Sequence, residues 1–535
     1  MKNRQISLMT RMVKRSGYAL VCACVYLTMA SRAVYADDAT NSDAPPQPYI
    51  QYTKNGPSDR NSVIELAKKL AQSPYQAPSE PLPKSLAGMS LAQYKSILFQ
   101  PNQAVWAKDN LPFQMQLLMR GSYFDAPVEI ATVDNGQANH LPFSPQLFTH
   151  SSGEPLTLPD QDIGFSGLSF YYRLNQPETY NKVIEFQGAS YFKAIGKNEH
   201  WGASARGLAI DTADPKGEEI PVFRAFWVEK PSDSSNSIVV NALLDSPSVT
   251  GAYRFTIRPG DTTTMDVEVS LFPRKDLSKV GLAPMNSMYM FSTNDRQNFD
   301  DYRPEVHDSD GLLMVNGKGE RLWRPLTNPK TLQMSAFVDE APIGFGLMQR
   351  DRNFSDYQDL SEHFQDRPSL WVEPIGNWGK GSVSLIEIPS DSEIHDNIVA
   401  YWAPKSPLKA GSEYDYSYRL HWGQDPHPAS NTYVISGTYA GRTAESKNSS
   451  HRHFVIDYRS PNASIPATAS MPMVNVITSK GKITDVQVVK NAYTPGYRVS
   501  FNLDGEGISA AELRAELTFN DNRKAETWLY RWTSS

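Results

Sequence analysis

The strongest constraint on the fold of this chain is an alternation of apolar and polar residues with a period of two. From Met265 to Leu271 the apolar side chains Met, Val, Val and Leu alternate with Asp, Glu and Ser. A helix would scatter these apolar groups around its axis, whereas a strand places all of them on one face. We therefore predict a half-buried strand here, which must pair with other strands to form a sheet.

Further apolar runs predict more strands, at Ser237–Leu244, Ser382–Ile388 and Ile398–Trp402. The chain contains 38 prolines and 32 glycines, many of them between such runs, which favours strands joined by loops over alternating strands and helices. Helices are predicted only near the beginning, over 62–70, where Ser62 and Glu65 have capping-box spacing, and over 91–98. The predicted fold class is all-β.

A chain of 535 residues is too long for a single hydrophobic core, so we predict two domains. Residues 60–425 form a large β-sandwich, the polar stretch 426–450 is a linker, and residues 451–535 form a small immunoglobulin-like sandwich of short strands. Residues 37–59, rich in Asp, Asn, Ser and Pro at their start, are expected to be a disordered leader. The strands expected in the small domain are Phe454–Tyr458, Asp485–Lys490, Val499–Leu503, Leu513–Phe519 and Trp528–Trp532.

Residues 1–36 have the pattern of a secretory signal peptide. A basic segment ends at Arg15, an apolar run follows to about Ala30, and small residues precede a cleavage site after Ala36. The basic segment carries no paired arginines followed by an apolar residue, which favours general secretion over twin-arginine export. We expect a periplasmic protein if the source is a Gram-negative bacterium. An uncleaved membrane anchor and lipidation at Cys24 are the alternatives.

Charge and cysteine usage exclude several classes of function. The formal net charge is −6, and residues 1–36 contribute six positive and no negative charges, so the remainder carries −12. Such an acidic chain is a poor nucleic-acid binder. Both cysteines, Cys22 and Cys24, lie in the signal segment, which excludes thiol chemistry from the mature chain. Phosphate-loop, dinucleotide-binding and serine-hydrolase motifs are absent, and we expect no cofactor and no metal.

Aromatic and basic residues gather in the second half of the predicted large domain. Indole faces beside guanidinium groups suit the apolar faces and polar rims of sugar rings, so we predict that these residues bind an oligosaccharide. The alternative is that the tryptophans fill the core of the sandwich. The predicted substrate-binding residues are Tyr302, Arg303, Trp323, Arg324, Trp371 and Trp378.

Two carboxylates in the same region, Asp308 and Asp396, are candidates for acid/base work on a glycan. Inverting glycoside hydrolysis requires one carboxyl to protonate the leaving oxygen and a second, roughly 6.5–9.5 Å away, to activate water. Asp396 precedes an apolar strand, where partial desolvation would raise its pKa. The alternative is structural: Asp308 would cap a turn that ends at Gly311, and Asp396 a bend before the strand.

Several motifs, in the same order, resemble the periplasmic glucan biosynthesis proteins of the G and D types. The resemblance covers roughly residues 60–535, and the Sec-like leader makes the G type the better match. The motifs are Gly188–Phe192, Ala205–Thr212, Leu244–Pro247, Tyr302–Glu305, His307–Ser309, Trp323–Leu326, Gly344–Leu347 and Asp396–Trp402.

This resemblance implies a galactose-mutarotase-like sandwich with a long cleft, joined to an immunoglobulin-like domain, and a role in making periplasmic glucans with a β-1,2-linked glucose backbone. By motif match, Asp396 corresponds to the general acid of an inverting hydrolase, and Asp308 to the base, which reaches the attacking water through a hydrogen-bonded relay. Phe364, a further predicted substrate-binding residue, stands where hydrolytic members carry tyrosine. The missing hydroxyl puts rapid hydrolysis in doubt.

Three functions compete at this point. The first is an enzyme that trims or remodels β-1,2-glucan, and the second is a binding protein that presents the nascent glucan to a partner. The third is an interaction module whose C-terminal domain docks a membrane glucosyltransferase. The retained carboxylates favour the first function, and Phe364 favours the second.

Overall fold

The computed structural model describes residues 51–534 apart from 55, 79–81, 153–157, 159–161, 443–449, 462–464 and 466–468. The predicted signal segment and residues 37–50 of the predicted leader lie outside this part of the chain. The end of that leader is ordered, in contrast to our expectation of disorder, because the buried carboxylate of Glu129 accepts hydrogen bonds from the backbone N–H groups of Gln51, Tyr52 and Thr53.

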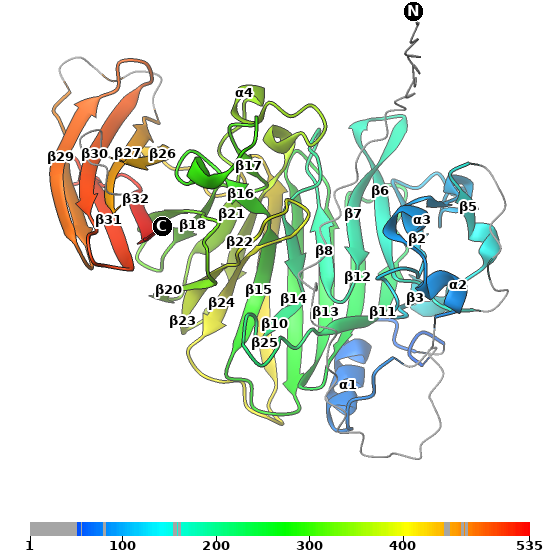
Figure 1. Cartoon of the computed structure of the whole chain (residues 1–535). Coiled ribbons are helices and arrows are strands. Elements are labelled where there is room, and N and C mark those ends of the chain that lie inside the picture. The colour runs from blue at the N-terminus through cyan, green and yellow to red at the C-terminus, as the bar shows by residue number, and fades with distance from the viewer. Residues whose placement is uncertain are drawn as a thin grey trace, which may run out of the picture.

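Most of the described chain forms two large sheets, which confirms the predicted all-β class (Figure 1). The larger sheet has 14 strands and runs the length of the molecule. In spatial order its strands are β28 (Met473–Thr478), β31 (Ala510–Thr518), β32 (Thr527–Thr533), β19 (Arg321–Pro325), β18 (Gly311–Val315), β21 (Gly344–Met348), β22 (Ser369–Ile375), β25 (Tyr414–Gly423), β14 (Thr263–Pro273), β13 (Val249–Arg258), β12 (Ile238–Asp245), β11 (Val222–Glu229), β3 (Glu129–Asp134) and β4 (Gln137–His140).

The second large sheet has ten strands and packs against the first. Its strands are β2 (Phe113–Leu118), β6 (Gly167–Gln176), β7 (Thr179–Gln187), β8 (Tyr191–Ala194), β9 (Ser204–Arg206), β15 (Val280–Ser287), β24 (Ile398–Pro404), β23 (Lys380–Glu387) and β20 (Gln333–Glu340), with β10 (Leu208–Ile210) paired to β15.

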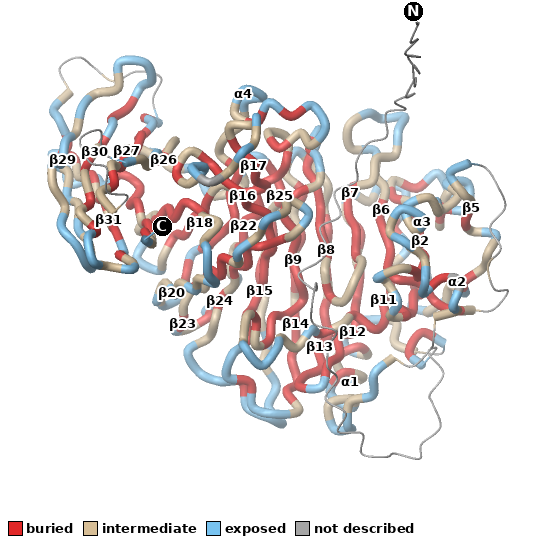
Figure 2. The backbone as a smooth tube through the Cα atoms, viewed as in Figure 1, coloured by how far each residue is buried: buried red, intermediate tan, exposed pale blue. Residues whose placement is uncertain are grey.

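The core of the large domain lies between these two sheets, as the buried band in Figure 2 shows. The predicted alternation is confirmed in β14, where Met265, Val267 and Val269 are buried and the residues between them are partly exposed. Phe186 of one sheet meets Phe255 of the other edge to face, with ring centroids 5.2 Å apart. Apolar faces of paired strands thus build the core that the sequence pattern predicts.

The C-terminal domain is a second, smaller sandwich. A four-stranded sheet of β26 (Val434–Arg442), β27 (His451–Arg459), β30 (Gly496–Asp504) and β29 (Lys482–Lys490) packs against β28, β31 and β32. The predicted linker 426–450 contains β26, which pairs with β27. Because β32 pairs in parallel with β19, the large sheet continues from one domain into the other.

Short elements complete the fold. Helix α1 (Arg60–Ala71) covers the outer face of the 14-stranded sheet with Val63 and Ala67, and its N-cap is Asp59 rather than the predicted Ser62. In the described part of the chain, no helix combines the length and the apolar character needed to cross a bilayer. The other short elements are α2 (Lys84–Ala87), α3 (Leu91–Lys95), α4 (Phe354–Tyr357), η1 (Pro101–Gln103), η2 (Pro145–Leu147), η3 (Arg296–Asn298), η4 (Phe364–Asp366) and the pairs β1 (Ile97–Phe99) with β5 (Phe148–His150) and β16 (Tyr289–Phe291) with β17 (Val306–His307).

Candidate active site

Asp308 lies directly after the short strand β17, which pairs with β16. Its backbone N–H donates to the carbonyl of Met288 at 2.9 Å, and the next residue, Ser309, contacts Ser287 through a hydroxyl–hydroxyl bond of 2.8 Å. These bonds hold Asp308 at the end of β15.

Asp396 is held beside the same segment by its neighbour Asn397. The Asn397 amide accepts from the backbone N–H of Tyr289 at 2.8 Å and donates to the carbonyl of Tyr289 at 2.9 Å. Strand β24, which begins two residues after Asp396, pairs with β15 through Ile398 and Ser287. The fold therefore brings Asp308 and the neighbour of Asp396, although the two aspartates are 88 positions apart in sequence, to the consecutive residues Met288 and Tyr289.

The environment of Asp308 combines burial with a positive partner. Its side chain is 1% exposed and forms an ion pair with Arg367. Burial raises the pKa of Asp308, and the nearby Arg367 guanidinium opposes that rise without cancelling it. Arg367 also donates to Glu362 at 2.6 Å, so it is fixed between two carboxylates.

Asp396 has a different environment, next to an aromatic and basic pair. It is 5% exposed, and its negative charge contributes to a raised pKa of Tyr191, whose main cause is burial. Arg206 lies 5.5 Å from the Tyr191 ring centroid and forms a 2.7 Å ion pair with Glu218. The two carboxylates thus have unlike surroundings, as a general acid and a general base require.

The segment 353–367 covers Asp308. Phe364, at 1% exposure, packs against Tyr357 with ring centroids 5.6 Å apart, and the Arg367 guanidinium carbon lies 4.2 Å from the centroid of the Phe364 ring. The Tyr357 hydroxyl donates to the carbonyl of Asp351. Phe364 therefore places an apolar ring, not a hydroxyl, beside the cation that binds Asp308.

A second group of carboxylates lies on the other side of Asp308. Glu305 and Asp351 share a side-chain hydrogen bond, and Glu305 also contacts Nε2 of His307 at 3.0 Å. Burial, together with the charges of neighbouring carboxylates, raises the pKa of Glu305 and Asp351 to about 8 and that of Asp310 to about 7. These residues face a cavity of about 40 Å³ between the two domains.

Some described side chains have the spacing of metal ligands. The groups Glu305–His307–Asp351, His200–His363–Asp366 and His451–Asp504–Glu506 each bring three donor atoms within 4.8 Å of one another. In the first group both ring nitrogens of His307 already have partners, Glu305 at 3.0 Å and Gln349 at 2.8 Å. We therefore assign that group to proton sharing.

The three predicted tryptophans lie inside the protein. Trp323 and Trp371 belong to the core of the C-terminal sandwich, and Trp378 belongs to the core of the large domain, where its indole N–H donates to the carbonyl of Ser417. Gly311 and Gly344 lie so close to the Trp323 and Trp371 rings that no side chain would fit at either glycine. Because these indole faces pack against protein, we do not include the three residues in the proposed sugar-binding set.

The remaining predicted binding residues divide into exposed and buried groups. Tyr302 is 75% exposed, and the neighbouring Arg303 forms ion pairs with Asp301, Asp359 and Glu393. Arg324 is fully buried in an ion pair with Glu387 at 2.9 Å, which makes it a structural residue. Tyr302 thus offers a surface to a ligand, whereas Arg324 does not.

Sequence reasoning missed several residues of the site, including Arg367, Tyr191 and Arg206. Arg367 occurs among the clustered arginines, but nothing in its local pattern shows that it reaches Asp308, 59 positions away. Tyr191 and Arg206 both lie within motifs of the family resemblance, and their place in these motifs was the sequence signal that could have identified them. The close spacing of three acidic residues, Glu305, Asp308 and Asp310, was a second sequence signal for the site.

Comparisons with known proteins show which family this chain resembles. Residues 59–532 match the family model "Periplasmic glucan biosynthesis protein, MdoG". The chain is 55% identical to glucans biosynthesis protein G of Vibrio cholerae (strain M66-2) over 90% of its length and 88% of the relative, and 54% identical to that of Shewanella sp. (strain MR-7) with the same coverage. A galactose mutarotase related enzyme from Lactobacillus acidophilus aligns with 44% of this chain and 96% of its own at 9% identity and a TM-score of 0.20, which is too low to support an argument.

The predicted family, its role in glucan biosynthesis and the periplasmic location are confirmed by these matches. A glucan is accordingly the class of substrate. The chain belongs to the family of periplasmic glucan biosynthesis proteins.

Proposed function

We propose that this protein binds β-1,2-glucan and trims it by an inverting glycoside hydrolysis. Asp396 gives its proton to the leaving glycosidic oxygen, while Asp308 accepts, through a relay, a proton from the water that attacks the anomeric carbon. The glycosidic bond breaks, and the new carbon–oxygen bond forms on the opposite face of the sugar.

One observation carries this proposal: Asp308 is held beside Met288 by its backbone, and Asp396 is held beside the adjacent Tyr289 by its neighbour Asn397, although the two aspartates are distant in sequence. The bonds that fix this arrangement come from the backbone of Asp308 and the side chain of Asn397. The carboxylate groups of Asp308 and Asp396 are not used in these bonds. The different partners of the two side chains, Arg367 for Asp308 and the Tyr191–Arg206 pair beside Asp396, support a division into base and acid.

Because Asp308 and Asp396 are both buried, hydrolysis requires a movement that exposes them to the glucan. A glucan reaches Asp308 only if the segment 353–367 moves, because Arg367 of this segment is ion-paired with the buried Asp308 and is itself packed against Phe364. The proposal therefore includes an opening of this segment when glucan binds. Its exposed apolar residues, Phe354 and Leu360, are available to contact the substrate.

The direct test is to incubate the protein with linear β-1,2-glucan and resolve the lengths of the products. We expect Asp396→Asn and Asp308→Asn each to reduce cleavage by about 10²–10⁴-fold, the range that a general acid or base contributes. The matched control is Asp391→Asn, the same change at an exposed position of the loop before Asp396. Normal cleavage by either active-site variant would refute the assignment.

A second candidate function is glucan binding without appreciable cleavage. Phe364 favours it, because the resemblance places a tyrosine there in hydrolytic members and the present ring carries no hydroxyl. We expect Phe364→Tyr to raise the cleavage rate about tenfold or more by supplying a group for proton transfer.

Product analysis under the conditions of the first test checks this expectation, with Phe99→Tyr as the control, since Phe99 is a partly buried ring of β1 that packs against Phe148. An unchanged rate in Phe364→Tyr would show that the hydroxyl does not limit the reaction. Intact glucan in all samples, with measurable binding, would leave the binding function.

A further inference from the structure

A cationic pocket lies at the junction of the two domains, away from Asp308 and Asp396. It is lined by the turn after β16, by the segment after β19, and by β26, β27 and β32. Its volume is about 90 Å³. One water molecule needs roughly 10–15 Å³ by the same measure, so the pocket has room for a group several times larger.

The charges of this pocket are unbalanced. Of the described residues that line it, Asp295 alone is acidic, whereas Lys330, Arg452 and Arg531 are basic. Arg531 forms an ion pair with Glu512 at 3.2 Å. Even with Asp295 ionised, Lys330 and Arg452 leave the lining with one excess positive charge.

Arg452 is the central observation. It is 6% exposed, and among the described residues it has no carboxylate partner; one of its guanidinium nitrogens donates to Gln297 at 3.1 Å. A buried guanidinium without a counterion is unfavourable, because burial removes hydration that no anion replaces. Burial accordingly lowers the pKa of Arg452.

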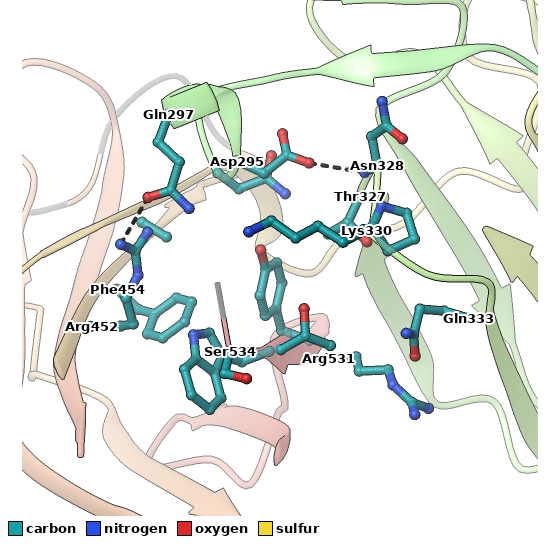
Figure 3. Close-up of a pocket in the computed structure, with 16 residues that line it drawn as sticks. Asp295, Gln297, Thr327, Asn328, Lys330, Gln333, Arg452, Phe454, Arg531 and Ser534 are labelled. Carbon is teal, nitrogen blue, oxygen red and sulfur yellow. Dashed lines mark hydrogen bonds between the residues drawn. The ribbon is translucent and has the colours of Figure 1, made fainter. Parts of the chain in front are cut away.

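Asp295 does not supply that missing partner. Its carboxylate accepts from the Tyr289 hydroxyl at 2.9 Å and from the backbone N–H groups of Ser292 and Asn328 at 3.1 and 3.0 Å. Figure 3 shows Lys330 extending into the pocket between Asp295 and Arg452. The side chains of Lys330 and Arg452 thus both line the pocket, with the amide groups of Gln297 and Asn328 beside them.

We propose that this pocket binds a small oxyanion, a phosphate-type group, between Arg452 and Lys330. The guanidinium presents a fork of donors that suits such oxygens, and the ammonium adds a point charge. The aromatic side chains Tyr530 and Trp532 of the lining provide an apolar wall for the carbon skeleton that carries the group. The ligand bridges the two domains, since Lys330 comes from the large domain and Arg452 from the small one.

The test is to titrate the full-length protein with sodium phosphate, glycerol phosphate and glucose 6-phosphate, and to measure binding by calorimetry and by the change in intrinsic tryptophan fluorescence. We expect saturable binding that weakens as salt increases. Lys330→Gln, at an exposed position, should weaken binding about tenfold without affecting folding, and Arg452→Gln should weaken it further. Arg459→Gln is the matched control, because Arg459 lies exposed in the same strand β27 outside the pocket.

The probes distinguish the source of the anion. Tighter binding of glucose 6-phosphate than of phosphate would indicate a sugar that carries the charge, and equal binding would indicate a free anion. Absence of saturable binding for all three probes would overturn the proposal, as would equal affinity in the parent, Lys330→Gln and Arg452→Gln. Glucan cleavage is not required for any of these results, so failure here is separate from failure of the proposed function.

Discussion

Replacing Arg350 by methionine is expected to lower the free energy of unfolding by up to about 3–5 kcal/mol, because it removes the closer of the two guanidinium partners of a buried carboxylate. That carboxylate is Glu526, which is 0% exposed and accepts from Arg350 at 2.7 and 2.9 Å. Burial alone would raise the pKa of Glu526, but the charge and hydrogen bonds of Arg350 hold it below the usual value. The ion pair is therefore held in its charged form.

The effect should be large because the same residues connect the two domains. Arg350 follows β21 of the large domain and also donates to the carbonyl of Ile435 at 2.6 Å, while Glu526 precedes β32 and accepts from the backbone N–H of Ile435 at 3.0 Å. Loss of Arg350 removes the hydrogen-bonded partner of Glu526 at the point where the shared sheet crosses from β19 to β32, and leaves only the more distant Arg321 at 3.8 Å.

Urea denaturation of the parent and variant measures this difference. The matched control is Arg60→Met, which breaks an ion pair with Glu268 that is about one third exposed, and which should cost at most about 1 kcal/mol. A loss no larger in Arg350→Met than in Arg60→Met would show that the pair contributes little to the attachment of the domains.

The all-β class and some of the strands could be predicted from the sequence because alternation is a local signal. The predicted strands at 265–271 and 398–402 correspond to β14 and β24. Strand β26 was missed, because its small and polar residues, Ser436, Gly437 and Thr438, mask its pairing with β27. The predicted helix at 91–98 ends at Lys95, where strand β1 soon follows.

The candidate site could be predicted only in part. The motif resemblance selected Asp308 and Asp396, which spacing alone could not choose among 58 acidic residues. The Arg367–Asp308 ion pair depends on how the segment 353–367 folds over the sheet, and no local pattern encodes that. Composition alone could not decide between a sugar-binding role and a core role for the tryptophans. The packing of β18, β19 and β22 shows that Trp323 and Trp371 are buried in a core.

Raising the pH from about 5 to about 8 is expected to destabilise the protein by several kcal/mol, because buried carboxyl groups must then release protons. The pKa of Glu305 and Asp351 is raised to about 8 and that of Asp310 to about 7 by burial and by the negative charges of neighbouring carboxylates. In the unfolded chain these groups ionise near pH 4. The folded state therefore retains protons that the unfolded state has lost.

Because the folded state holds more protons than the unfolded state, the free energy of unfolding decreases as the pH rises. The stabilisation is complete below about pH 4 and decreases between about pH 4 and the raised pKa values of about 7 and 8, at on the order of 1.4 kcal/mol for each group and each pH unit. Above those pKa values it does not decrease further. The neighbouring charges of His307 and Arg350 oppose the rise for Asp310 but do not cancel it.

Asp351→Asn isolates the effect, because the amide keeps a hydrogen-bonding group beside Glu305 and removes one titrating carboxyl. We expect the variant to lose less stability than the parent between about pH 5 and about pH 8. Urea denaturation at a series of pH values measures both slopes, and the exposed Asp391→Asn serves as the matched control with the slope of the parent. Equal slopes for Asp351→Asn and the parent would show that proton sharing between Glu305 and Asp351 does not govern stability. A shallower slope would identify this cluster, which faces the cavity between the domains, as a source of pH sensitivity at their junction.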